Sequence, residues 1–311
     1  MTVAVLNLGG TIALSYDASG RPVTLPASEL VGDQDHELFE LDPVQSNALS
    51  WSHLLALRAA LVRLAQSGNR TAVVITGTGT VEDVATFLHV AGPAESRVAL
   101  LVSFADASGG GRAPGIDAAL TWLRADHAGG LRLFADGTPF DYPFEKHCGS
   151  GAWQFLAKPR DLGVPPWRLP SSSPLAQEVP RIPVASAGIE AATWIGPLLE
   201  LVPSDGLILE AYGAGDVPPP VADQVRAYVA DGGHVVVTSL ARPGLVEPTY
   251  PGIPGTSHGL LSAGCYGGGV LTARQARMRL AVALASGIPN APRDAFASFM
   301  PTTSPSSPGA S

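Results

Sequence analysis

The chain has 311 residues, 46% of them hydrophobic, which is enough for one large or two ordinary domains with sizeable cores. Its formal net charge of −8 argues against a nucleic-acid partner, because binding to a phosphate backbone needs clustered lysine and arginine. The two cysteines, Cys148 and Cys265, lie far apart and have no metal-ligand spacing. Neither a disulfide framework nor a metal site is therefore indicated, and a reducing, cytoplasmic setting is expected.

The N-terminal sequence is typical of a first strand. Met1 is followed at once by an apolar run, without the basic region and cleavage site of a signal peptide. No apolar run in the sequence approaches the roughly 18 residues of a membrane helix. We expect a soluble protein with no membrane partner.

In the first half of the chain, short apolar segments alternate with segments of helical period. The predicted strands cover residues 3–8, 72–75, 98–102 and 131–134, and the predicted helices cover 52–66, 81–90 and 116–124. The strands lack an apolar/polar alternation, which is typical of a parallel sheet with helices on both faces. We expect one α/β domain over residues 1–157.

Proline and serine accumulate without any period over residues 158–183, which we interpret as a linker. Beyond it, strands are predicted at 184–186, 206–210 and 234–238, and helices at 189–201, 221–230 and 273–285. The sequence therefore predicts a smaller C-terminal α/β domain over 184–290. The composition of residues 291–311 predicts a disordered tail.

Two glycine–threonine turns directly follow predicted strands. They are Gly9-Gly10-Thr11 and Gly77-Thr78-Gly79-Thr80. Ligands of open α/β sheets bind beyond the carboxyl ends of the strands, so we expect both turns to lie at the site. The glycines permit positive φ and close backbone approach, and we expect Gly9 and Gly10 to leave N–H groups free for an oxyanion. Thr80 could cap the following helix.

These segments and others resemble the bacterial-type L-asparaginases. Leu8-Gly-Gly-Thr-Ile-Ala13 is close to the family's Thr-Gly-Gly-Thr-Ile-Ala, and the second turn is similar to its His-Gly-Thr-Asp-Thr. Asp136-Gly137, then Phe144-Glu145-Lys146-His147, and then Leu209-Glu-Ala-Tyr-Gly-Ala-Gly-Asp-Val-Pro218 follow in the family's order. The resemblance covers most of residues 2–287.

The resemblance implies a larger flavodoxin-like, doubly wound N-terminal domain and a smaller C-terminal domain. It also implies a hydrolase that cleaves a side-chain amide through an acyl-threonine intermediate and releases ammonia, with no cofactor. Thr11 matches the nucleophile, and Thr78 matches the second threonine, which works with a lysine matching Lys146. A lysine desolvated beside two hydroxyls can accept a proton in its neutral form. The alternative for Lys146 is a surface ion pair with Glu145.

The departures concern residues that would recognise the substrate. Gly79 stands where the family has the aspartate that holds the α-ammonium group of the substrate, and burial of an unpaired ammonium is costly. The serine that receives the substrate carboxylate aligns with Gln45 or Ser46. The loop tyrosine of the family has no clear counterpart, since Arg21 falls near its place and Tyr16 lies earlier.

We therefore expect the substrate-binding residues among Gly10, Tyr16, Arg21, Gln45, Ser46, Gly77 and Gly79. One hypothesis is an amidohydrolase whose small amide substrate lacks or masks the α-ammonium group, and ordinary L-asparaginase activity is another. The third is a catalytically degenerate homologue that binds a small ligand or a partner. The resemblance also implies a homodimer or homotetramer.

Overall fold

The computed structural model describes residues 2–32, 36–125, 129–149, 151–158, 167–241 and 244–297. The described residues up to 158, with 168–179 and 285–287, form one compact unit. Trp167 and residues 180–284 and 288–297 form the second. No helix among the described residues is long and apolar enough to cross a membrane.

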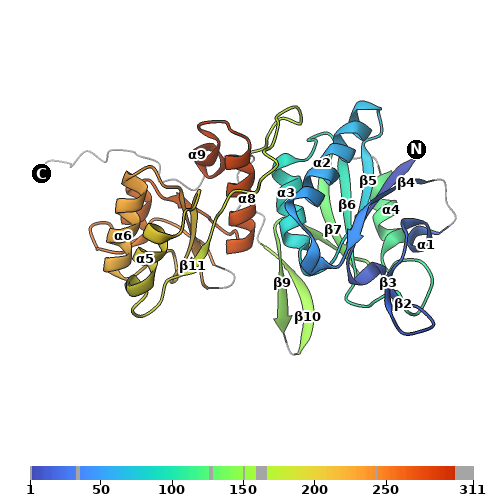
Figure 1. Cartoon of the computed structure of the whole chain (residues 1–311), viewed down its shortest axis with the longest axis horizontal. Coiled ribbons are helices and arrows are strands. Elements are labelled where there is room, and N and C mark those ends of the chain that lie inside the picture. Colours follow the sequence, from blue (N-terminus) through green and yellow to red (C-terminus); the bar gives the residue numbers. More distant parts are fainter. Residues whose placement is uncertain are drawn as a thin grey trace, which may run out of the picture. The chain divides into compact units, whose positions relative to one another are not determined.

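The first unit is built on a six-stranded sheet of order β4-β1-β5-β6-β7-β8, in which every pairing but the last is parallel (Figure 1). The strands are β1 (Val3–Gly9), β4 (His36–Val44), β5 (Thr71–Ile75), β6 (Arg97–Val102), β7 (Gly130–Ala135) and β8 (Thr138–Asp141). Of the five parallel strands, β4 is the second along the chain and lies at the edge of the sheet beside β1, the first. This strand order is that of flavodoxin-like folds. The predicted fold class is confirmed.

Helices cover both faces of this sheet because its central strands are buried on both sides. The helices are α1 (Ala27–Val31), α2 (Trp51–Gln66), α3 (Val81–Ala91) and α4 (Ile116–Arg124). Alternate residues of β1, β5 and β6 pack with α1 and α4 in one core cluster. Helices α2 and α3 lie over the other face (Figure 1). The strands β1, β5, β6 and β7 and the helices α2, α3 and α4 agree with the sequence prediction to within one or two residues, whereas α1 was not predicted.

Several strands of the first unit escaped the sequence prediction. The edge strand β4 carries several charged residues and is at least partly exposed along its whole length, so it lacks the apolar signal of its neighbours. Strand β8 forms a hairpin with β7 through Asp136-Gly137, whose φ values of 46° and 86° suit the tight turn that Asp-Gly favours. Two antiparallel ribbons complete the unit. They are β2 (Leu14–Tyr16) with β3 (Pro22–Thr24), and β9 (Phe144–Gly149) with β10 (Ala152–Ala157).

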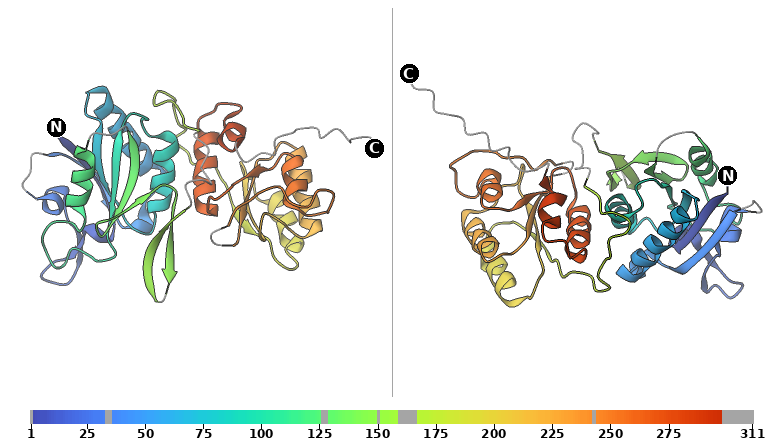
Figure 2. Two further views of the ribbon diagram at one scale, coloured as in Figure 1. Left: turned by 180° about the vertical axis from the view of Figure 1, so that it is seen from behind. Right: turned by 90° about the horizontal axis from the view of Figure 1, so that it is seen from above.

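The second unit holds a parallel four-stranded sheet of order β11-β12-β13-β14. Its strands are β11 (Val184–Ser186), β12 (Leu207–Ala211), β13 (Val235–Ser239) and β14 (Tyr266–Gly267). Its helices are α5 (Ala192–Leu201), α6 (Pro219–Ala230), α7 (Ser257–Ser262), α8 (Ala273–Ala285) and α9 (Ala291–Ala295). Helices α5 and α6 share one core cluster with the sheet, and α8 and α9 share the other (Figure 2).

Helix α9 corrects the prediction of a disordered tail over 291–311. Ala291, Ala295 and Phe296 are buried in the core beneath α8, and this burial outweighs the Pro-rich composition. Residues 298–311 lie outside the described residues. The described parts of the predicted linker, residue 158 and residues 167–183, contain neither helix nor strand.

Candidate active site

The two glycine–threonine turns meet at the carboxyl ends of β1 and β5, which are neighbouring strands. Gly9 and Gly10 have φ values of 86° and 90°, as the sequence predicts for a turn of this kind. A β-carbon on Gly10 would lie 2.3 Å from the Cα of Gly77, so the two turns are in direct backbone contact. Thr11 and Thr78 each follow one of these touching glycines.

The prediction that Gly9 and Gly10 leave their N–H groups free is wrong. The Gly9 amide donates to Asn7 Oδ1 at 2.9 Å, and the Gly10 amide donates to the carbonyl of Val44 at 2.9 Å. Both bonds shape the turn, because buried amides need acceptors. Within the described part of the chain, the amides of Thr11 and Thr78 donate to no other group. The available donors are therefore those of the threonines.

Asn7, which the sequence analysis did not single out, supports the first glycine–threonine turn. Its side chain is fully buried, and its amide donates to the carbonyl of Leu25 at 3.1 Å and to Glu40 Oε2 at 2.8 Å. Glu40 also accepts from the Ala27 amide through its other oxygen. The sequence could have indicated this role, because Asn7 is a polar residue near the end of an otherwise apolar strand, and buried polar side chains need hydrogen-bond partners.

Lys146 on β9 reaches the second turn. Its Nζ lies 3.1 Å from Thr78 Oγ1, and Thr78 is 8% exposed. The Lys146 backbone amide donates to Glu82 Oε1 at 3.1 Å, and Glu82 lies in the first turn of α3. Helix α3, which begins after the second turn, thus also binds strand β9, which carries Lys146. Thr80 occupies the N-cap position of α3, but its hydroxyl makes no capping hydrogen bond.

Glu145, the alternative partner of Lys146, contacts the other lysine of the chain. Glu145 Oε2 lies 3.5 Å from Lys158 Nζ, and both of those side chains are buried. Successive residues of a strand point to opposite faces, so Lys146 and Glu145 face different surroundings. The two lysines of the chain therefore serve different contacts.

Ser46 lies against the glycines of the second turn. It begins a short 3-10 helix, Ser46–Ala48, directly after β4, and Gln45 precedes it. A β-carbon on Gly77 would lie 1.7 Å from Ser46 Oγ, and one on Gly79 would lie 2.9 Å from Ser46 Cβ. The structure therefore brings Gly10, Ser46, Gly77 and Gly79 together, with Gln45 adjoining, and a side chain at position 79 would meet Ser46.

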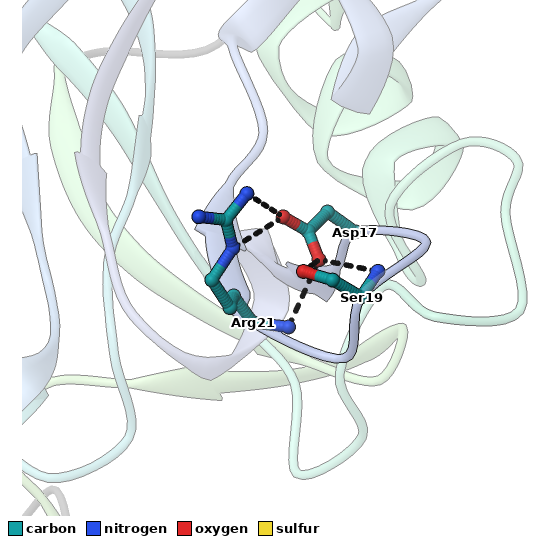
Figure 3. A network of polar contacts seen from close by, with 3 residues as sticks. All are labelled: Asp17, Ser19 and Arg21. Atoms are coloured by element: carbon teal, nitrogen blue, oxygen red, sulfur yellow. Dashed lines mark hydrogen bonds and ion pairs between the residues drawn. The ribbon is translucent and has the colours of Figure 1, made fainter.

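The β2–β3 hairpin carries Tyr16 and Arg21. Asp17 accepts hydrogen bonds from the Ser19 hydroxyl at 2.6 Å and from the backbone amides of Ser19 and Arg21 (Figure 3). The Arg21 guanidinium pairs with the same carboxylate at 2.9 Å. These bonds, that from the Ser19 hydroxyl foremost, lower the pKa of Asp17 to about 2. The structure thus gives Arg21 a role in the turn, and Tyr16 lies half exposed on β2. Their part in substrate binding stays a prediction.

Among the described residues, no group of three or more His, Cys, Asp or Glu side chains is arranged to hold a metal ion. The candidate site is instead made of hydroxyls, one amine and backbone amides. That set suits nucleophilic attack on a carbonyl compound, since hydroxyl nucleophiles need only a proton acceptor and donors for the oxyanion.

Comparison with known proteins points to one family. A model described as "Asparaginase, N-terminal" matches residues 2–109, and one described as "Glutaminase/Asparaginase C-terminal domain" matches residues 190–295. A probable L-asparaginase of Deinococcus radiodurans is 30% identical over 91% of this chain and 92% of its own length. An L-asparaginase of Bacillus licheniformis is 25% identical over 91% of this chain and 95% of its own.

Solved structures agree on the fold. A probable cytoplasmic L-asparaginase from Campylobacter jejuni superposes with a TM-score of 0.71 at 17% identity, covering 96% of this chain and 98% of its own. The thermostable L-asparaginase from Thermococcus kodakarensis gives a TM-score of 0.71 at 19% identity, covering 97% of this chain and 100% of its own.

Proposed function

The chain belongs to the asparaginase family of amidohydrolases, and from that membership we propose that it cleaves a carboxamide with Thr11 as the nucleophile and releases ammonia. One observation carries the proposal. The Lys146 amine donates a hydrogen bond of 3.1 Å to the Thr78 hydroxyl. Thr78 follows Gly77, which contacts Gly10 in the turn that carries Thr11.

The reaction has two halves. In the first, Thr11 Oγ1 attacks the amide carbon, its proton passes to the Thr78–Lys146 pair, and that pair protonates the departing nitrogen, so an acyl-threonine ester and ammonia form. In the second, water attacks the ester, and the carboxylic acid and free Thr11 are regenerated. A hydroxyl attacks poorly until a base takes its proton, so a neutral Lys146 amine has the central part in both halves.

The tetrahedral oxyanion needs hydrogen-bond donors. Gly9 and Gly10 already donate within the turn, and we assign the task to the backbone amides of Thr11 and Thr78. Preorganised backbone donors are worth roughly 10²–10³ in rate in other hydrolases.

We further propose that the substrate lacks or masks the α-ammonium group. Gly79 offers no carboxylate, and the space beside it is taken by Ser46. An ammonium group placed there would lose its water without gaining an opposite charge. A primary amide with an acylated or absent α-amino group avoids that cost.

The same observation favours a second candidate, a degenerate homologue that binds a small ligand without turnover. The two functions differ in one result. Only the first requires ammonia release that depends on Thr11.

The test is ammonia release from a panel of amides that includes L-asparagine, L-glutamine and their N-acetyl derivatives. We expect the wild type to favour the N-acetylated amides, and Thr11→Ala to lower kcat at least about 10³-fold for each hydrolysed compound. Thr121→Ala, on the exposed surface of α4, is the matched control and should retain full activity. Equal rates for wild type and Thr11→Ala would overturn the covalent route, and ligand binding without any turnover would favour the second candidate.

A further inference from the structure

We propose that Trp153 is a positioning residue, which together with Phe104 and Phe155 forms an aromatic platform that holds the Lys146 amine over Thr78. The proposal rests on the proposed function of Lys146. The Lys146 Nζ lies 4.7 Å from the centroid of the Trp153 ring and 5.5 Å from that of Phe104. The same atom lies 3.1 Å from Thr78 Oγ1.

The register of the β9–β10 ribbon places these groups on one face. Phe155 pairs with Lys146, and Trp153 pairs with Cys148. Side chains two residues apart share a face of a strand, so Trp153 and Phe155 both lie on the Lys146 face. The ribbon extends away from the six-stranded sheet (Figures 1 and 2). Phe104 approaches from the segment that follows β6.

The platform is anchored by a cluster of rings. Phe155 is 5% exposed and stacks on Phe104, with centroids 5.5 Å apart and planes inclined by 29°. It also contacts Phe144 edge-on at 5.7 Å and Phe140 at 5.9 Å. Rings packed in this way have few other rotamers, so they offer a fixed surface for the long side chain of lysine. Trp153 covers the amine from the more exposed side.

The platform suits a lysine that must give up its proton. A carboxylate in contact with an amine strongly favours the charged ammonium form, whereas a ring face attracts the ammonium only weakly. Gly79 provides no carboxylate, and Glu145 points to the other face and pairs with Lys158. The rings therefore orient Lys146 without adding a negative charge to its surroundings.

The first test needs no substrate. The chain has only two lysines, Lys146 and Lys158, so protein grown with ¹³C-lysine gives two ε-methylene signals, which Lys146→Met assigns. Ring currents shift protons that lie over an aromatic face. In Trp153→Leu we expect the Lys146 signal to move towards that of free lysine and the Lys158 signal to stay in place. Leu156→Ala, on the opposite face of β10, should leave the Lys146 signal in place. An unmoved Lys146 signal in Trp153→Leu would overturn the proposal.

The second test is kinetic and uses an amide that the wild type hydrolyses. We expect Trp153→Leu to lower kcat about 5-fold with KM changed less than about 2-fold, because the interaction orients a base and contacts no substrate. Trp153→Phe, which keeps a ring face, should recover most of the loss. A raised KM at unchanged kcat, or equal losses in the two variants, would contradict a positioning role.

The kinetics of Lys146→Met and Trp153→Leu distinguish a failure of this inference from a failure of the proposed function. If Lys146→Met is inactive while Trp153→Leu matches the wild type in kcat and KM, only the platform is wrong. If Lys146→Met retains the wild-type rate, Lys146 is not the base, and the platform loses its role with it.

Discussion

At the scale of single residues, the central feature is the pair Gly79 and Ser46. The sequence indicated that position 79 lacks an acid, but it could not indicate what lies beside it, because Ser46 follows a different strand. A β-carbon at position 79 would lie 2.9 Å from Ser46 Cβ, closer than ordinary van der Waals contact. The φ of Gly79 lies outside the left-handed region, so its backbone conformation would allow a side chain. The obstacle to a side chain at position 79 is therefore the steric contact with Ser46.

This pair predicts how ammonium recognition can be introduced. The double variant Gly79→Asp/Ser46→Gly removes the contact and supplies a carboxylate. We expect its kcat/KM for L-asparagine to rise about 10- to 100-fold over the wild type, as hydrogen bonds to charged groups are worth roughly 1.5–3 kcal/mol. Gly79→Asp alone should gain less, because Ser46 still obstructs the side chain.

The matched control for that experiment is Gly79→Asn/Ser46→Gly, which has the same shape without the charge. Steady-state ammonia release from L-asparagine compares the three variants. Equal kcat/KM values for the aspartate and asparagine doubles would show that charge at position 79 does not govern the choice of substrate.

At the scale of elements, the sequence predicted the buried strands and amphipathic helices well and the ribbons poorly. Strand β5 is buried throughout, whereas β3 and β10 are largely exposed and β2 has only three residues, so local sequence gives these three strands little signal. The ribbons nevertheless carry Tyr16, Lys146 and Trp153. The resemblance singled out Lys146 as a candidate, whereas the proposed ring platform depends on the cross-strand register, which sequence alone does not reveal.

The β2–β3 hairpin supplies a prediction about pH. Because the pKa of Asp17 is depressed in the folded state, its hydrogen bonds stabilise the turn above the ordinary carboxyl range and are lost as pH falls through about 2. Ser19→Ala removes the largest contribution and should raise that pKa towards 3.8, while Arg21→Ala should raise it less. Carboxyl ¹³C NMR titration measures both. An unchanged midpoint in Ser19→Ala would contradict the network of Figure 3.

At the scale of the whole molecule, the alternation of predicted strands and helices along the sequence was enough to predict a parallel sheet and a second α/β unit. It was also enough to place the two turns at the carboxyl ends of strands. It could not supply the contact of Gly10 with Gly77, since that contact depends on β1 and β5 being neighbours while β4 lies outside β1. The homodimer or homotetramer implied by the resemblance stays a prediction.

The central claim is that Thr11 forms an ester with the acyl group of the substrate. The direct measurement is rapid acid quenching during turnover of the slowest hydrolysed amide, followed by mass spectrometry of the intact chain and of its peptides. The account predicts a mass increase equal to the acyl group, confined to the peptide that contains Thr11 and absent in Thr11→Ala. Ammonia release without any adduct, or an adduct on Thr78 instead, would contradict it.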